Sequence, residues 1–283
     1  MKKVLLGLLV ALALGGGLFA YSRHARKTDT RAVLNPTLAA SYNKTGDLLK
    51  PNAAPSDQAL RSLKELTQRD AKNALSHYLL AAAYSKRSQW TDTAIELKAG
   101  NDADYCVFYR KEDSIFSKFP NFTALREIAR NCAISAPTLS GNQNETLLLA
   151  ARQMGTRVAR MEPKMLLSVL VGVAIHSIID SGLVRLYTKT GKTKDAEAAQ
   201  ARLDIERAWT KSPQFQTDSG VNEANAEQKA LLVKYDLGER EVMAAADGKS
   251  LPAEKMKRMR EFNKEVSEQE QARTEKLLQS LPE

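Results

Sequence analysis

The sequence predicts an all-α protein: a stack of antiparallel helical hairpins that follows a hydrophobic N-terminal helix. Hydrophobic residues make up 43% of the 283 residues, so a sizeable core can form. Aromatic residues reach only 6%, and the 14 glycines and 9 prolines are too few for a turn-rich β fold. The stretch from Met165 to Tyr187 is apolar on every side of a helical wheel, which is typical of a buried helix.

The N-terminus has the pattern of an export signal or a membrane anchor. Lys2 and Lys3 precede an apolar run that covers residues 4–20. Four basic residues follow this run: Arg23, Arg26, Lys27 and Arg31. The run is longer than a usual signal core and ends in a poor cleavage site. We therefore interpret residues 1–27 as an uncleaved membrane anchor, with a cleaved signal peptide as the alternative.

The orientation of this anchor does not follow from charge, because basic residues flank both ends of the apolar run and the positive-inside rule uses both. The start of the chain resembles those of bacterial envelope proteins, and this resemblance implies a body outside the cytoplasm, in the periplasm. A body that faces the cytoplasm is one alternative. A cytosolic protein whose first helix is buried in its own core is another.

The body, residues 28–250, is predicted to be an α-helical hairpin domain. Four helices are expected outside its central part, at residues 36–49, 56–69, 121–133 and 147–160. Three arginines of the last of these helices are expected to face solvent: Arg152, Arg157 and Arg160. Residues 74–99 predict two antiparallel helices joined by a short turn near Ser88, with the small Ala81 where the helices touch.

The central stretch, Met165 to Tyr187, is predicted to be a core helix rather than a membrane span. Its uninterrupted apolar part is shorter than the roughly 20 residues that a span needs. Asp180 and Arg185 also lie too deep in the stretch for a span. Gly191 is expected to end the helix in the left-handed conformation.

One face of this helix carries small and polar residues at i+4 spacing: Ser168, Gly172, His176 and Asp180. Small residues allow a neighbouring helix to approach closely, and His176 and Asp180 can form hydrogen bonds there. One hypothesis is a His–Asp pair that acts as acid or base in an open cleft. The alternative, which we favour, is a buried polar pair that is satisfied by its neighbours, since no Ser, Cys or metal-ligand motif completes a catalytic set.

The C-terminal part is predicted to contain shorter helices and one long helix. After a helix at 193–210 and a loop at 211–222, short helices are expected at 223–236 and 239–246. Residues 251–283 form a charged amphipathic segment, with a helix that opens at Pro252. This helix has a narrow apolar stripe: Met256, Met259, Phe262 and Val266. The stripe can dock on the body, on a partner helix or on a membrane.

Residues 74–100 share a spacing pattern with residues 180–210. A small residue, a tyrosine, a turn residue and two further positions occur at the same offsets in both: Ala81, Tyr84, Ser88, Trp90 and Thr93, then Val184, Tyr187, Gly191, Thr193 and Ala196. This pattern resembles the tetratricopeptide hairpin, although Ser88 stands where the motif has a turn glycine. The resemblance covers about a quarter of the chain and implies a concave surface for protein partners.

Aromatic residues concentrate between positions 84 and 122 and are our candidates for a ligand or partner groove: Tyr84, Trp90, Tyr105, Phe108, Tyr109 and Phe116. The alternative is that they form the core between two helical layers, which is the commoner use of such residues. Cys106 and Cys132 can form one disulfide in an oxidising compartment, or remain two independent buried thiols.

The composition favours a protein-binding function. The net charge is +9, but acidic and basic residues are mixed and no basic run is interleaved with aromatics, so we expect no nucleic-acid binding. We expect no catalytic residue, metal or cofactor. The sequence thus predicts a membrane-anchored, non-enzymatic scaffold with protein partners. The alternatives are a carrier of an apolar ligand or peptide in the aromatic groove and an enzyme that uses His176 and Asp180.

Overall fold

The computed structural model describes residues 36–51, 53–108, 121–139, 143–162, 164–215, 221–246 and 251–282. Within these ranges the chain is α-helical, with one 3-10 helix (η2, Ala136–Thr138) and two isolated β-bridges but no strand. The all-α fold class predicted from the sequence is therefore confirmed. The anchor predicted at residues 4–20 lies outside the described residues.

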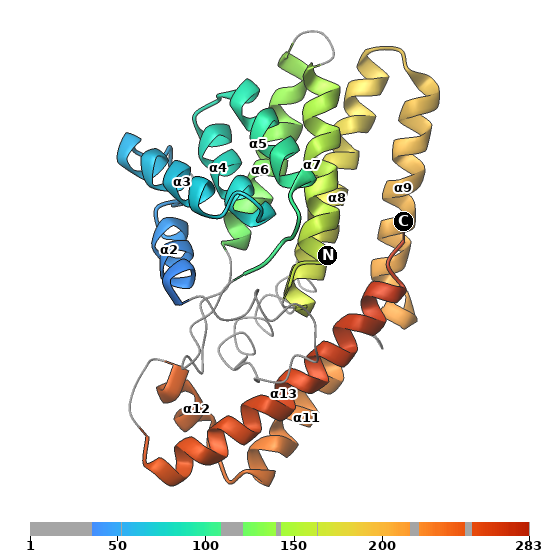
Figure 1. Cartoon of the computed structure of the whole chain (residues 1–283). Helices are drawn as coiled ribbons and strands as arrows, with labels where there is room; N and C mark the ends of the chain where they lie inside the picture. Colours follow the sequence, from blue (N-terminus) through green and yellow to red (C-terminus); the bar gives the residue numbers. More distant parts are fainter. Residues whose placement is uncertain are drawn as a thin grey trace.

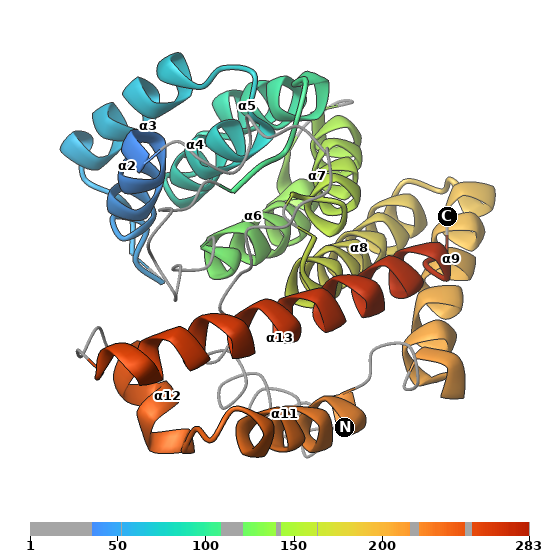
Figure 2. The ribbon, with the colours of Figure 1, turned by 60° about the horizontal axis from the view of Figure 1, so that its bottom comes forward.

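The described helices fall into an N-terminal and a C-terminal group (Figure 1). The first group is α2 (Pro36–Gly46), α3 (Asp57–Arg69), α4 (Ala74–Lys86), α5 (Trp90–Asp102), α6 (Phe122–Ser135), α7 (Gln143–Ala159), α8 (Leu166–Lys189) and α9 (Thr193–Lys211). The second is α11 (Val221–Lys234), α12 (Glu239–Ala246) and α13 (Ala253–Gln279). Figure 2 shows α13 running along one side of the first group, from α12 toward the end of α9.

Local signals in the sequence set the starts of three described helices. The side chains of Ser56, Asn73 and Asn121 accept hydrogen bonds from backbone N–H groups in the first turns of α3, α4 and α6. Each of these bonds satisfies a donor that the helix cannot pair by itself. Asn121 thus caps the start of the helix that the sequence predicted at residues 121–133. α7 begins four residues before the expected Leu147, at Gln143.

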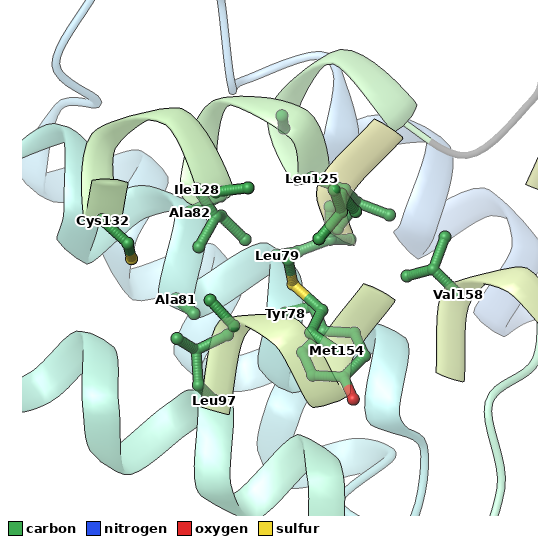
Figure 3. Packing of buried hydrophobic residues seen from close by; sticks show 14 of the residues in the cluster. Tyr78, Leu79, Ala81, Ala82, Leu97, Leu125, Ile128, Cys132, Met154 and Val158 are labelled. Atoms are coloured by element: carbon green, nitrogen blue, oxygen red, sulfur yellow. The ribbon is translucent and has the colours of Figure 1, made fainter. Parts of the chain in front are cut away.

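The main core lies between α4, α5, α6, α7 and α8. Figure 3 shows its centre, where Tyr78 and Leu79 of α4 meet Leu97 of α5, Leu125 of α6 and Met154 of α7. All five side chains are at most 2% exposed. Burying an aliphatic side chain of this size stabilises the fold by about 2 kcal/mol relative to leaving it in water. Residues from many positions along the chain thus share one continuous apolar interior.

Helix α8 occupies the central position that the sequence predicted. It packs against α6, α7 and α9 and also contacts α13. By length and composition α8 could cross a membrane, and within the described part of the chain it is the one such helix; 61% of its most apolar window is buried inside the protein. The neighbours of α8 therefore cover most of its apolar surface.

The turns after α4 and α8 have the same geometry. Ser88 and Gly191, which occupy equivalent positions, have φ angles of 57° and 71°. The N–H of the following residue bonds back to a tyrosine carbonyl, from Gln89 to Tyr84 at 3.0 Å and from Lys192 to Tyr187 at 2.9 Å. This is the hydrogen-bond pattern of a left-handed helix cap. The left-handed residue predicted at Gly191 is confirmed.

The C-terminal helices share a smaller core. Leu231 and Leu232 of α11, Val242 of α12 and Phe262 of α13 are buried together. This core includes residues on both sides of the boundary predicted at position 250. At its other end α13 buries Leu277 against α8 and the end of α9, together with Val169 and Phe215. Helix α13 therefore docks on the body through its apolar stripe and its C-terminal leucines.

Candidate functional site

A groove lies between the α4–α5 turn and helix α6. It has a volume of about 290 Å³. Seven of its lining residues are polar or charged, namely Ser85, Lys86, Ser88, Glu127, Arg130, Asn131 and Ser135, and four are apolar, namely Ala53, Ala54, Trp90 and Ile134. The left-handed turn at Ser88 ends α4 and allows α5 to start at Trp90, which places both residues in the lining.

The floor of the groove holds a buried ion pair. The Lys86 ammonium contacts the Glu127 carboxylate, and their side chains are only 5% and 11% exposed. The same ammonium donates a hydrogen bond of 2.8 Å to the carbonyl of Lys50. Glu127 Oε2 receives no hydrogen bond of ordinary geometry despite this contact. The Glu127 carboxylate and the Lys50 carbonyl thus largely neutralise the charge of Lys86 within the protein.

The α6 wall of the groove presents a free cation and an apolar side chain to solvent. Arg130 is exposed, and within the described residues it takes part in no ion pair or hydrogen bond. Ile134, one helical turn further along α6, is 65% exposed. Asn131, the residue after Arg130, donates a long hydrogen bond of 3.4 Å to Ser85 Oγ. This wall can therefore contact a ligand through both charge and apolar surface.

The aromatic residues predicted to form one groove are separated in the structure. Trp90 lines the groove just described. Tyr84 and Phe108 are buried in the main core, at 8% and 4% exposure. Tyr105 donates a hydrogen bond of 2.9 Å to Asp70. The two remaining candidates, Tyr109 and Phe116, lie outside the described residues.

The Tyr105 hydroxyl belongs to a buried polar network that sequence reasoning missed. Asp70 also accepts hydrogen bonds from Tyr42 at 2.8 Å and from the amide of Asn73 at 2.9 Å. Asn73 in turn bonds both the N–H and the carbonyl of Val107. These contacts join α2, the α3–α4 turn and the segment after α5. Asp70 and Asn73 precede α4 closely, so their only sequence signal was that of a helix cap.

His176 and Asp180 are buried as predicted, at 6% and 0% exposure, but each is satisfied by other helices. Arg152 of α7 and Arg202 of α9 both donate to Asp180, at 3.1 Å and 2.9 Å. The expectation that Arg152 faces solvent was wrong, because this buried carboxylate draws the guanidinium into the helix interface. The carboxylate is therefore shared between two neighbouring helices.

The histidine has its own partners. His176 Nε2 lies 3.1 Å from the hydroxyl of Thr156, and Nδ1 lies 3.4 Å from Glu206 of α9. Glu206 also accepts a hydrogen bond of 2.9 Å from Ser177. Together the residues Arg152, Thr156, His176, Ser177, Asp180, Arg202 and Glu206 form a polar cluster between α7, α8 and α9. The small Gly172 of the same stripe lets α7 approach α8 closely, as expected.

The structure also answers the expectations for Arg157 and for the two cysteines. Arg157 was also expected to be solvated, and this was wrong: it donates to the carbonyls of Asn101 and Ala103 at 3.0 Å and 2.7 Å. Cys106 and Cys132 are free thiols rather than a disulfide. Burial raises the pKa of each thiol to about 12, so both are protonated at neutral pH.

Within the described residues no group of three or more His, Cys, Asp or Glu side chains is arranged to hold a metal ion. No family model, curated protein or solved structure matches this chain. The groove and the polar cluster must therefore be interpreted from their own geometry.

Proposed function

We propose that this protein is a membrane-anchored, non-enzymatic scaffold that binds a protein partner through the groove at the α4–α5 turn. The observation that carries the proposal is the combination, in that groove, of an exposed Ile134 with the exposed Arg130, which has no ion pair or hydrogen bond to the described residues. Contiguous apolar surface with a polar rim is typical of protein-binding sites, and Ile134 shares the lining of the groove with three further apolar residues. The anchor is residues 4–20, and the body lies outside the cytoplasm of a bacterial cell.

The tetratricopeptide resemblance supports the same proposal. The turns at Ser88 and Gly191 have matching φ angles and matching hydrogen bonds, as two copies of one hairpin would have. Proteins built from such hairpins bind partners on the surfaces that their repeats form together. The groove uses the first of these hairpins, with α6 as its second wall.

The rival functions have less support. An acid–base role for His176 and Asp180 requires an open cleft, and both side chains are buried in a helix interface. Their polar atoms are occupied by partners that hold α7 and α9 to α8. A carrier of an apolar ligand requires an apolar cavity, whereas most residues that line the groove are polar or charged.

The test is crosslinking in native membranes followed by affinity purification of the full-length protein and identification of the copurifying proteins. We expect a specific partner in stoichiometric amount. A protein that is recovered alone from growing cells, with and without crosslinking, would contradict the scaffold function. The proposed anchor predicts that the protein resists alkaline extraction from membranes. The proposed orientation predicts that protease added to spheroplasts digests the body.

A further inference from the structure

We propose that the groove at the α4–α5 turn binds a short acidic peptide segment, with one carboxylate on Arg130 and an adjacent apolar side chain between Trp90 and Ile134. This inference rests on the proposed scaffold function and specifies the chemistry of the partner. It makes the groove a recognition site for a linear segment rather than for the folded surface of another protein.

The charge of the groove selects an anion. Lys86 and Arg130 each contribute one positive charge and Glu127 one negative charge, so the lining is net positive by one. Because Glu127 already pairs with Lys86, Arg130 is the cation left to bind a ligand. A guanidinium presents two parallel N–H donors that match a carboxylate. The net charge of +9 for the whole chain also raises the rate at which acidic segments approach.

The geometry of α6 selects an apolar neighbour for that carboxylate. Arg130 and Ile134 are four residues apart, so they lie on one helix face about 5–6 Å from each other at their Cβ atoms. This spacing suits two nearby side chains of an extended peptide. Trp90 forms part of the groove lining, and the carbonyl oxygen of the Asn131 side chain, with no partner among the described residues, can accept a peptide N–H.

The size of the groove limits the length of the segment. A volume of about 290 Å³ is at the lower end of the range for ligand sites. It accommodates the side chains of a few residues, and it is too small and too polar for a long acyl chain. A short extended segment that contacts the groove through two side chains on one face, those of residues i and i+2, fits both limits.

The test uses the full-length protein in detergent and a phage-displayed library of random octapeptides. We expect the selected peptides to be enriched in Asp or Glu two residues away from Leu, Ile or Phe. The variant Arg130→Gln should lose the acidic preference, and Ile134→Ser should lose the apolar preference. Binding of a selected peptide to Arg130→Gln should be about tenfold weaker, as expected for the loss of one charged contact.

The matched control is Arg160→Gln, which removes the same charge from an exposed position of the chain outside the groove. It should retain both preferences. The inference is overturned if no peptides are enriched, if the enriched peptides are basic, or if Arg130→Gln selects the same peptides as the wild type. If a partner copurifies equally with the wild type and Arg130→Gln, the scaffold function stands and this inference fails. If no partner copurifies at all, the scaffold function itself fails.

Discussion

The hairpins α4–α5 and α8–α9 share one turn geometry but hold their helices together by different means. In the first hairpin, α5 buries four of its 13 residues and packs on α4 with Leu97 in the main core and Gly100 against the ring of Tyr78. In the second, α9 buries three of its 19 residues and packs chiefly on α8, through the polar cluster around Asp180. The comparison teaches that the turn fixes the hairpin, whereas the neighbours of each helix decide what fills its interface.

The largest expected effect is in the polar cluster. Asp180→Asn should lower the free energy of unfolding by about 3 kcal/mol, because it leaves two guanidinium groups without their buried partner. This value is at the lower end of the range for breaking a buried ion pair, because the side chains of Arg152 and Arg202 are 22% and 32% exposed to solvent. Urea unfolding measures it. The control is Asp204→Asn on α9, whose side chain is 61% exposed and which should change stability by less than about 0.5 kcal/mol.

The next effect tests close helix packing at the contact of α5 with α4 and at the contact of α8 with α7. A Cβ at Gly172 would lie 2.6 Å from the Cβ of Ala159, and one at Gly100 would overlap the buried ring of Tyr78. We expect Gly172→Ala and Gly100→Ala each to lower the free energy of unfolding, measured by thermal unfolding, by about 2 kcal/mol, because the added methyl group overpacks the core. Gly182→Ala is the control, because its nearest neighbour is 3.1 Å away and alanine favours the helix. Equal stability of all three variants would refute this account.

A reciprocal exchange tests the shared turn. A non-glycine residue in the left-handed region costs about 1 kcal/mol. Ser88→Gly should therefore stabilise the first hairpin by about 1 kcal/mol, and Gly191→Ala should destabilise the second by a similar amount. Both changes are measured by thermal unfolding. If they have the same sign, the two turns are not equivalent.

The smallest effect is a difference in pH dependence. Burial lowers the pKa of His77 in the first hairpin, but hydrogen bonds to Glu96 at 2.7 Å and to the Ala71 carbonyl outweigh it, so its pKa is raised above the ordinary 6.5. The charged form is stabilised by folding, so the contribution is complete below pH 6.5 and is lost as pH rises through the raised pKa. We expect His77→Gln to cost about 1 kcal/mol at pH 5.5 and nothing at pH 9, by urea unfolding.

The second hairpin should respond in the opposite direction. Hydrogen bonds from Lys192 and Tyr187 hold the pKa of Glu145 below its ordinary 4.5. Its contribution is therefore present above pH 4.5 and is lost as pH falls through the lowered pKa. Glu145→Gln should cost under about 1 kcal/mol at pH 7, because the pair is solvent-screened, and nothing at pH 3. A cost for Glu145→Gln that grows as pH falls would contradict this.

Much of the helical framework could be predicted from the sequence because its signals are local. Apolar periodicity placed most helix bounds within a few residues, and Asn121 and Gly191 marked a start and an end through their own backbone hydrogen bonds or conformation. The candidate site could not be predicted in the same way. Trp90 was identified by its residue type, but Arg130 and Ile134 of the facing helix carry no local mark of a groove.

The sequence by itself determined that this chain is helical, that the stretch from Met165 to Tyr187 forms a buried central helix, and that this helix has one small and polar face. Only the tertiary structure decided how that face is used. His176 and Asp180 suggested a pair by spacing, yet the partners of Asp180, Arg152 and Arg202, come from α7 and α9, more than 20 residues away on either side. Spacing along one helix specifies which side chains share a face, whereas the packing of other helices against that face specifies their partners.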